Sequence, residues 1–536
     1  MPVFWCACSQ VYATYTVSLN QNNFDGSQLS IKGGDTVFIE PGHRDHLRFY
    51  NIHGDSLNPV VFINIGGLVE ISTTTNNYGF QVYDCSYFKL TGTGTDSLAY
   101  GIKIGYTPAG TNGLSLDGFS TNYEVDHIEV LNSGFAGICA NPVPDCDNLL
   151  NRGNFTRMNT LFHDNYVHNT SGEAFYIGSS FYNGYTILCD SVQKIVYPHE
   201  IHGLKIYNNI VDASGWDGIQ VGCATKDCEI YGNRISNYGV LNITDQNFGI
   251  IIGAGTGGKC YNNLIVNGTG NGMCVFGIGG NLIYNNIIVN PGHALNDIMA
   301  TARANGIFCD DRYTTDGSSF CFLNNTIISP TGDGIRFFSK LSKNNIICNN
   351  IILNPGTLGA YSPYDNPDLP FVYTIPGVDV TISTNYYSKT VSASVNYGNP
   401  DEVYTYCKAL PVLDKGIDVT DYGIMEDFYH NNRKINNACD IGAFEYPDSI
   451  IQLLKLTSIK VIPGNNTGEL YIYSVKNELI NGVQIYRLNG QLIYSNKPNT
   501  VNTLLKTIDY MQSGIYLVRI NTQNDERVLK INSCYQ

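Results

Sequence analysis

A short motif recurs through the middle of the chain and constrains the fold more than any other feature. It is an apolar run that ends in an Asn pair or in Gly-Asn. Its copies are IYNNI at 206–210, IYGNRI at 230–235, YNNL at 261–264, IYNNI at 283–287, LNNT at 323–326 and CNNI at 348–351. A small residue followed by a β-rich run alternates with this motif. The small residues are Ala174, Gly218, Gly249, Gly272, Gly306 and Gly334.

The spacing of these small residues predicts the architecture. Successive copies are 44, 31, 23, 34 and 28 residues apart, so the shortest spacing sets the basic unit and the longer ones contain inserted loops. Two or three short strands per unit, with no helix period, are typical of the coils of a parallel β-helix, which must stack to bury their inward faces. Asn at the same turn of successive coils can bridge its amide to the coils on either side, about 4.8 Å away. A β-propeller is the alternative, but it requires a longer and more regular period.

Composition supports an all-β protein. Only 14% of the 536 residues are charged, 43% are hydrophobic, and Gly and Tyr are abundant at 55 and 38. This balance excludes a disordered chain. The net charge of −15 argues against nucleic acid or an anionic membrane as a partner, and no apolar run is long enough to predict a transmembrane helix.

Sixteen cysteines in an acidic chain suggest an oxidising compartment. Spacing offers candidate disulfides but cannot fix their connectivity, and buried free cysteines are the alternative. The candidate pairs are Cys139 with Cys146, Cys223 with Cys228, Cys309 with Cys321, and Cys407 with Cys439. Residues 1–13 are interpreted as a truncated signal peptide, whose removal would take Cys6 and Cys8 with it.

Motifs in the first two thirds of the chain carry a family resemblance. GDTVFIEPG at 34–42, NPVVFIN at 58–64 and GEAFYIGSS at 172–180 resemble secreted right-handed parallel β-helix proteins, among them polysaccharide lyases of the chondroitinase-B and alginate-lyase type. PVLDKGID at 411–418 and DIGAFEY at 440–446 resemble the closing segment of extracellular bacterial β-helix proteins. The resemblance implies a β-helix over 14–355, with final coils and a cap over 356–450.

The end of the chain resembles a different family. Short alternating strands with Asn-Gly turns predict a small Ig-like β-sandwich over 451–536. VQIYRLNGQLIYSN at 483–496 and MQSGIYLVRINTQ at 511–523 resemble the C-terminal sorting domain of the type IX secretion system of Bacteroidetes. The resemblance implies that the protein is secreted or held at the cell surface, and that the type IX machinery is a partner.

The first candidate site is the column before the repeated small residues, which holds Glu173, Asp217, Phe248, Asn271, Asn305 and Asp333. If Glu173 and Asp217 lie on adjacent coils, their carboxylates are close enough to share a proton or to bind a cation, and we expect calcium because it takes oxygen ligands. The alternative is a turn column, in which Asp, Asn and Glu serve turn geometry.

The second candidate site is the insertion at 179–203. Long loops on a rigid solenoid often carry function, and aromatic rings beside carboxylates suit a carbohydrate groove. We expect a catalytic base among Lys194, His199 and His202. The expected substrate-binding residues are Tyr182, Tyr185, Tyr197 and Trp216. The alternative is a structural loop with its own aromatic cluster.

These patterns favour one function and leave two others open. The leading hypothesis is a monomeric lyase that cleaves an acidic, uronate-containing polysaccharide by β-elimination. A non-catalytic adhesin or glycan-binding protein is the second. The third is a hydrolase of the polygalacturonase type, which would use the acid pair Asp310 and Asp311, although a turn with ion pairs also explains that pair.

Overall fold

The computed structural model describes residues 12–293, 303–357, 371–434 and 438–446, together with the C-terminal strands between residues 459 and 533 without the segments that join them. Most of the predicted signal peptide, with Cys6 and Cys8, therefore lies outside the described residues. The chain divides into one unit at Met1–Glu445 and a second at Tyr446–Gln536. Each unit is described by itself.

Three long parallel sheets build the first unit. Sheet A contains β1 (Thr14–Val17), β3 (Thr36–Ile39), β6 (Val60–Asn64), β9 (Ser86–Thr91), β12 (Thr121–Asp126), β16 (Thr160–His163), β22 (Lys205–Tyr207), β25 (Glu229–Tyr231), β28 (Gly258–Tyr261), β31 (Asn281–Tyr284), β34 (Phe320–Leu323), β37 (Asn345–Cys348) and β40 (Val380–Ser383). Sheet B contains β2 (Asn23–Asp25), β5 (Leu47–Tyr50), β8 (Tyr78–Tyr83), β11 (Asn112–Asp117), β14 (Ile138–Ala140), β18 (Phe175–Ile177), β24 (Ile219–Val221), β27 (Ile250–Ile252), β30 (Met273–Val275), β33 (Ile307–Cys309), β36 (Ile335–Phe337) and β39 (Val372–Thr374). Sheet C contains β4 (Gly42–Arg44), β7 (Val69–Ile71), β10 (Ile102–Ile104), β13 (Ile128–Leu131), β17 (Tyr166–His168), β23 (Ile210–Asp212), β26 (Arg234–Tyr238), β29 (Leu264–Gly268), β32 (Ile287–Pro291), β35 (Thr326–Ile328), β38 (Ile351–Leu353) and β41 (Tyr386–Ser388).

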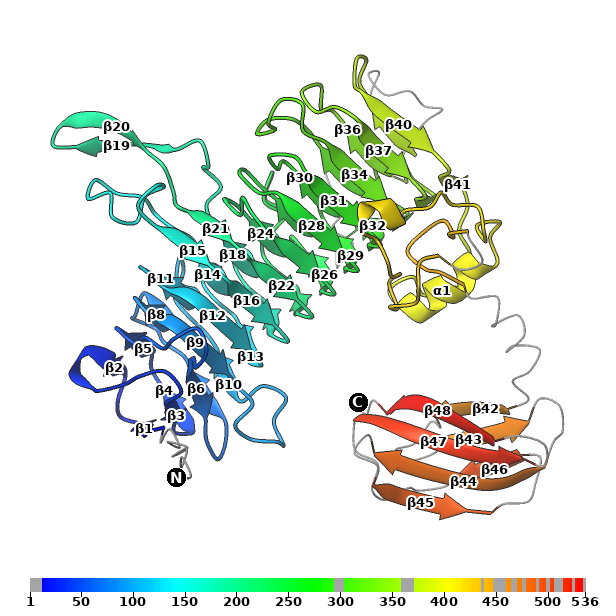
Figure 1. Cartoon of the computed structure of the whole chain (residues 1–536), viewed down its shortest axis with the longest axis horizontal. Helices are drawn as coiled ribbons and strands as arrows, with labels where there is room; N and C mark the ends of the chain where they lie inside the picture. Colours follow the sequence, from blue (N-terminus) through cyan, green and yellow to red (C-terminus); the bar gives the residue numbers. More distant parts are fainter. Residues whose placement is uncertain are drawn as a thin grey trace, which may run out of the picture. The chain divides into compact units, whose positions relative to one another are not determined.

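The chain visits the sheets in a fixed order, A, then C, then B, and each full circuit is one coil. Every strand pairs with the equivalent strand of the next coil, as β16 does with β22, so the coils stack along one axis (Figure 1). The predicted parallel β-helix is confirmed. The variable spacing of the sequence repeat has the expected cause, because the extra residues lie in loops between strands.

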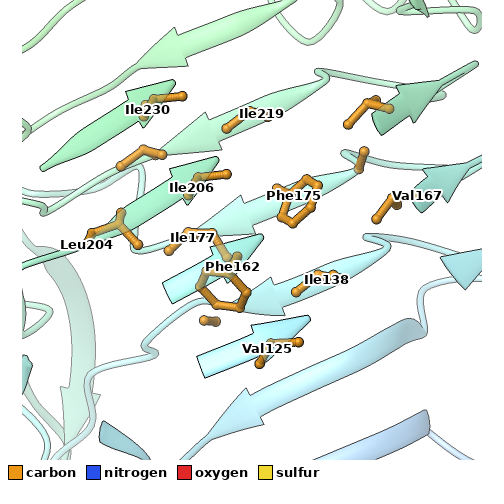
Figure 2. Packing of buried hydrophobic residues seen from close by; sticks show 14 of the residues in the cluster. Val125, Ile138, Phe162, Val167, Phe175, Ile177, Leu204, Ile206, Ile219 and Ile230 are labelled. Atoms are coloured by element: carbon orange, nitrogen blue, oxygen red, sulfur yellow. The ribbon is translucent and has the colours of Figure 1, made fainter. Parts of the chain in front are cut away.

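Inward side chains fill the β-helix in columns. Along sheet A, register places Val125, Phe162, Ile206 and Ile230 one above another, and all four are buried (Figure 2). The facing strands of sheet B contribute equivalent residues, such as Phe175 (Figure 2). Burial of such a side chain contributes about 1.5–3 kcal/mol, and no coil can achieve it alone.

The Asn pairs of the repeat have two separate tasks. The second Asn of each pair forms a buried ladder, in which each Nδ2 donates to Oδ1 of the Asn in the next coil at 2.9–3.0 Å. The ladder runs through Asn165, Asn209, Asn233, Asn263, Asn286, Asn325, Asn350 and Asn385. The predicted bridging of coils by Asn amides is confirmed.

The first Asn of the pair adopts a left-handed backbone conformation, with φ of 54° at Asn285 and 55° at Asn324. Asn tolerates this conformation better than most residues, which explains its use at the turn between sheets A and C. The outward amides then bind the cap segment, which we define as residues 411–434 and 438–445. Asn285 Nδ2 donates to the carbonyl of Glu426 at 2.8 Å, and Asn324 Nδ2 donates to that of Asp440 at 3.0 Å.

Helix is scarce in the described part of the chain. It comprises the short turns η1 (Gly26–Gln28) and η3 (Thr420–Tyr422) and the nine-residue helix α1 (Pro400–Lys408), which precedes the cap segment. Among the described residues, no helix has the length and hydropathy needed to cross a membrane.

Two insertions between sheets B and A lie side by side. One is the loop 141–155, and the other contains the antiparallel hairpin of β19 (Tyr185–Cys189) and β20 (Val192–Val196), which projects from the stack (Figure 1). The short strands β15 (Thr156–Met158) and β21 (Glu200–His202) pair at their base. A disulfide joins Cys146 of the loop to Cys189 of the hairpin.

This disulfide corrects the pairings predicted from spacing. Cys146 bonds to Cys189, 43 residues away, and not to Cys139. The remaining candidates, which are Cys139, Cys223, Cys228, Cys309, Cys321, Cys407 and Cys439, are free thiols. Short spacing misleads here because neighbouring cysteines in a coil lie on different strands or faces, whereas residues a whole coil apart lie close together.

The second unit is built from two antiparallel sheets. One contains β42 (Ile459–Pro463), β43 (Leu470–Ser474) and β46 (Asn502–Leu505), and the other contains β44 (Ile480–Arg487), β45 (Leu492–Asn496), β47 (Gly514–Thr522) and β48 (Glu526–Ser533). In the second sheet Val483, Ile485, Val518 and Ile520 are buried. The chain is thus all-β, as predicted.

Candidate functional site

A row of polar and aromatic side chains follows the outward face of sheet A. In-register pairing aligns Asp126 with His163, His163 with Tyr207, and then Tyr231, Tyr261 and Tyr284. These residues face outward because side chains alternate along a strand and their neighbours, such as Phe162, point into the core.

The four tyrosines of this row, Tyr207, Tyr231, Tyr261 and Tyr284, form a tyrosine ladder. Successive ring centroids are 4.9, 4.9 and 4.7 Å apart, and the planes differ by 2–7°. The coil spacing dictates this geometry, since it places each ring one strand separation from the next. His163 continues the stack, with its ring 4.6 Å from that of Tyr207.

Next to the ladder lies a cluster of acids and bases that consists of Lys89, Glu124, Asp126 and His163, from β9, β12 and β16. We call it the acid–base cluster. Lys89 Nζ lies 2.8 Å from Asp126 Oδ2 and also forms an ion pair with Glu124. His163 Nε2 lies 3.1 Å from Glu124 Oε1 and 4.0 Å from Asp126 Oδ2. Four groups that can exchange protons or bind a cation therefore share one face.

Neighbouring side chains hold the cluster in place. Asp126 is 1% exposed, and its Oδ1 accepts a hydrogen bond from Thr91 Oγ1 at 2.5 Å and lies 2.6 Å from His127 Nδ1. Asp164 Oδ2 lies 2.7 Å from His163 Nδ1, which orients the imidazole. Asp126 Oδ2 is buried and faces the Lys89 ammonium at 2.8 Å.

The contacts within the cluster shift the pKa values of Glu124, Lys89 and His163. The hydrogen bond with His163, together with Lys89, outweighs burial and lowers the pKa of Glu124 to about 2. Burial opposes the charge on Lys89, but hydrogen bonds to Asp126 and Glu124 raise its pKa. Burial opposes the charge on His163 as well, and Glu124 and Asp164 still raise its pKa. The cluster is thus a set of mutually stabilised charges.

Glu124, Asp126 and His163 can each offer one ligand atom to a metal ion, and these atoms lie within 4.8 Å of one another. Asp126 Oδ2 is buried and already faces a cationic group, the Lys89 ammonium, so its position suits such an ion. Two carboxylates and an imidazole suit zinc or manganese, whereas calcium prefers oxygen ligands alone. Lys89 now neutralises both carboxylates and would give way to the ion.

A cavity of about 270 Å³ adjoins the cluster on the same face. Lys89 and Glu124 line it together with Asn122, Tyr123 and Asn159. Amides and an aromatic ring beside charged groups are typical of the lining of ligand pockets. The cavity gives a ligand direct access to Lys89 and Glu124.

The structure brings the predicted pair Glu173 and Asp217 together on adjacent coils. Both are buried, at 1% and 0% exposure. With the Gln220 amide oriented to suit its neighbours, its nitrogen donates to Glu173 Oε1 at 3.1 Å and to Asp217 Oδ2 at 3.2 Å. Asp217 Oδ1 also accepts from the backbone N–H of Phe248 at 2.7 Å. Burial raises the pKa of Glu173 to about 7, and burial also raises the pKa of Asp217 well above its ordinary value. Calcium at this pair stays a prediction.

Other members of that column bond to the next coil as turn residues do. Asn271 Oδ1 accepts from the backbone N–H of Asn305 at 2.6 Å, and Asn305 Oδ1 accepts from that of Asp333 at 2.9 Å. The bond from Phe248 to Asp217 belongs to the same series. These three bonds are what the turn-column alternative predicts.

Side chains of the insertion form a compact cluster around Arg152 of the neighbouring loop 141–155. The guanidinium lies 3.7 Å from the ring centroid of Tyr182 and 5.4 Å from that of Tyr197. Tyr182 Oη donates to Glu200 Oε1 at 3.1 Å, and His202 Nε2 lies 3.2 Å from Glu200 Oε2. Three of the predicted site residues, Tyr182, Tyr197 and His202, therefore share this cluster.

The remaining predicted residues lie apart from it. Lys194 is exposed on β20, Tyr185 contacts Ser179 Oγ at 2.7 Å, and Trp216 packs against Phe135. His199 is 1% exposed, its Nδ1 lies 2.9 Å from the Leu150 carbonyl, and burial lowers its pKa to about 3. The catalytic and binding roles of these residues stay predictions.

The acid pair proposed for hydrolysis is engaged in local contacts. Asp310 forms an ion pair with Arg312 at 2.6 Å, and Asp311 Oδ2 accepts from the backbone of Lys340 at 2.7 Å. These contacts match the alternative interpretation of Asp310 and Asp311, a turn with ion pairs. The residues of the acid–base cluster were missed, and their only signal was that His163-Asp164-Asn165 has the place of Tyr207-Asn208-Asn209 in the repeat.

Comparison with known proteins gives a family match at the C-terminal end of the chain. Residues 460–532 match the family described as the secretion system C-terminal sorting domain. The protein is secreted or displayed at the cell surface. This sorting domain belongs to the type IX secretion system, as the resemblance implied. No curated protein matches the sequence.

Several solved structures are similar to this chain. A GH136 lacto-N-biosidase from Eubacterium ramulus is 13% identical over 71% of this chain and 68% of its own, with a TM-score of 0.38. A PL6 family polysaccharide lyase from Pseudopedobacter saltans is 11% identical over 69% and 94%, with a TM-score of 0.32. A mannuronan C-5 epimerase module from Azotobacter vinelandii is 14% identical over 67% and 92%, with a TM-score of 0.26. Sequence identities and TM-scores this low give no information about the activity of this chain.

Proposed function

We propose that the protein is a secreted enzyme that cleaves an acidic polysaccharide by β-elimination on the outward face of sheet A. The observation that carries this proposal is the position of Lys89. Its ammonium lies against both Glu124 and Asp126, at the edge of an open cavity and next to the tyrosine ladder. A base, a cation-binding set and an elongated polar surface are the parts that such a reaction needs.

Glu124, Asp126 and His163 are the residues that would hold a divalent cation. When bound, the cation would neutralise the uronate carboxylate and make the C5 proton more acidic. Lys89 would then lose the two carboxylates that hold its pKa up, because their charge is taken by the ion. Its neutral Nζ could accept the C5 proton, the electron pair would form the C4–C5 double bond, and the glycosidic oxygen would leave and be protonated by solvent.

The geometry favours Lys89 over the bases predicted in the insertion. His199 is buried against the Leu150 carbonyl, and His202 is bonded to Glu200. Lys194 lies on the projecting hairpin, where no described carboxylate forms an ion pair with it. We place the cation at Glu124, Asp126 and His163 and not at the Glu173–Asp217 pair, because Glu173 Oε1 and both Asp217 carboxylate oxygens already accept hydrogen bonds and burial raises the pKa of both carboxyl groups.

The test is the ultraviolet absorbance of the full-length protein mixed in turn with polygalacturonate, alginate and chondroitin. β-Elimination leaves a conjugated unsaturated uronate that absorbs, so we expect a rise with at least one polymer. We expect chelator to abolish the rise and manganese or zinc to restore it. New reducing ends without absorbance would identify a hydrolase instead. Binding without any cleavage would identify an adhesin.

A further inference from the structure

A pair of pockets lies farther along the same face, where the cap segment passes over the tyrosine ladder. One pocket, of about 530 Å³, lies between Tyr207 and Tyr231 on sheet A and Phe428, Tyr429 and His430 of the cap segment. The other, of about 230 Å³, adjoins it through shared lining residues and extends to Tyr261 and Tyr284. Together they have the size of a pocket for a small organic ligand.

The cap segment is held firmly in this position. The Glu426 carbonyl accepts from Asn285 Nδ2 at 2.8 Å. The guanidinium of Arg433, which is fully buried, donates to the Asn285 side chain and to the carbonyls of Gly442 and Phe444. The pocket is therefore built by two rigid elements, one of which is far away in the sequence.

Several polar groups that line the two pockets can still form hydrogen bonds to a ligand. The hydroxyl groups of Tyr207 and Tyr231 make no hydrogen bond to the part of the chain that the structure describes, whereas Tyr261 Oη donates to Glu229 Oε2 at 2.9 Å. Asn262 lines both pockets and is only 8% exposed. Its Oδ1 has no hydrogen-bond partner among the described residues. An unpartnered buried amide oxygen is costly unless a ligand or water satisfies it.

The charged groups in the lining indicate which kind of sugar the two pockets would bind. The ionisable side chains that line the two pockets, apart from the tyrosines, are Glu426 and His430, and these form an ion pair at 2.8 Å. Neither pocket is lined by Lys or Arg. An anionic sugar would thus find no free cation, while hydroxyl and amide groups would find donors, acceptors and aromatic surface.

We propose that this roofed pocket is a binding subsite for an uncharged sugar residue of the polysaccharide. The subsite lies next to the acid–base cluster, because Tyr207 of the pocket stacks directly on His163 at 4.6 Å. This proposal rests on the proposed function and specifies its substrate. The substrate is a heteropolysaccharide in which a neutral sugar adjoins the uronate that reacts. A polymer of uronates alone would place a carboxylate in the pocket.

The test compares the binding of two classes of tetrasaccharide to the full-length protein by calorimetry, with chelator present to prevent turnover. Chondroitin, hyaluronan and heparosan probes alternate a uronate with an N-acetylated neutral sugar, whereas galacturonan and mannuronan probes contain uronates alone. The pocket variant is Tyr207→Phe combined with Tyr231→Phe, which removes two hydroxyl groups and keeps the stack. The matched control is Tyr166→Phe on sheet C, which also lies in an aromatic stack.

We expect at least one alternating probe to bind wild-type protein at least tenfold more tightly than either uronate-only probe. We expect the pocket variant to lose about tenfold of that affinity and the control to lose none. If no alternating probe shows binding that depends on the two hydroxyl groups, the subsite is refuted. Because binding needs no cleavage, an inactive protein that binds in this way would refute the proposed lyase and leave the subsite standing.

Discussion

The imidazole of His163 stacks on the phenol ring of Tyr207, with ring centroids 4.6 Å apart and planes inclined by 15°. This contact joins the acid–base cluster to the tyrosine ladder. It also fixes the ring of His163 so that Nε2 faces Glu124 and Nδ1 faces Asp164. A change in the ladder is therefore expected to reach the cluster through the orientation of one side chain.

Lys89→Met should abolish lyase activity without loss of the fold. Met keeps the apolar length of the side chain and removes the amine that would accept the C5 proton. Loss of a general base costs roughly 10²–10⁴-fold in rate. We expect kcat to fall by at least 100-fold on the polymer that wild type cleaves, as measured by ultraviolet absorbance.

The matched control is Lys103→Met. Lys103 forms an ion pair with Glu129 at 3.5 Å and has similar exposure, but it lies on sheet C. We expect its activity to equal that of wild type. If Lys89→Met retains more than a tenth of the activity, the base is another group, and Lys194 and His202 become the next to test.

Asp126→Asn should weaken the binding of a divalent cation. The amide keeps the size of the side chain and can still accept from Thr91, but it removes the charge of a buried ligand. By calorimetry on the full-length protein, we expect manganese and zinc to bind wild type more tightly than calcium does, and the variant to lose at least tenfold. Glu229→Gln, farther along the same face, is the control. Equal binding by wild type and Asp126→Asn would contradict the site.

The fold could be predicted from the sequence because each copy of the repeat corresponds to one coil. An inward apolar residue, a left-handed Asn and a ladder Asn recur at each coil, and each has a local physical reason. In Ile283-Tyr284-Asn285-Asn286, for example, Ile283 is buried, Asn285 has positive φ and Asn286 belongs to the ladder.

The site could not be predicted in the same way. Lys89, Glu124 and His163 come from three coils separated by loops of different length, so that only the register of sheet A brings them together. The insertion concentrates His, Lys and aromatic residues in one segment, yet only Tyr182, Tyr197 and His202 share a cluster there. The pocket under the cap segment could not be predicted for a similar reason. Tyr207 and His430 are far apart in the sequence and come together only in the folded chain.

Asn263→Ala should destabilise the β-helix more than its small size suggests. Asn263 donates to Asn286 and accepts from Asn233, and all three side chains are buried. Its removal would leave neighbouring polar groups unpaired, at roughly 1–3 kcal/mol for each. We expect the free energy of unfolding to fall by about 2–4 kcal/mol in denaturant titrations. Asn208→Gly is the control, because Asn208 is exposed and its φ of 54° suits glycine.

Glu173→Gln should flatten the dependence of stability on pH. Burial raises the pKa of Glu173 to about 7 in the folded protein, against 4.5 for an ordinary glutamate. Between these values the folded state keeps a proton that the unfolded state releases, so stability is full below pH 4.5 and falls as pH rises toward 7. The shift corresponds to a loss of about 3 kcal/mol.

Asp217 and Gln220 also face the Glu173 carboxyl group, and burial raises the pKa of Asp217, so part of the pH dependence should persist in the variant. We expect the difference in unfolding free energy between pH 4.5 and pH 8 to be about 3 kcal/mol smaller in Glu173→Gln than in wild type. Glu70→Gln, at an exposed position, should leave that difference unchanged. If the two variants respond to pH alike, the buried Glu173 carboxyl group is ionised in the folded protein, and a cation at the Glu173–Asp217 pair becomes the better interpretation.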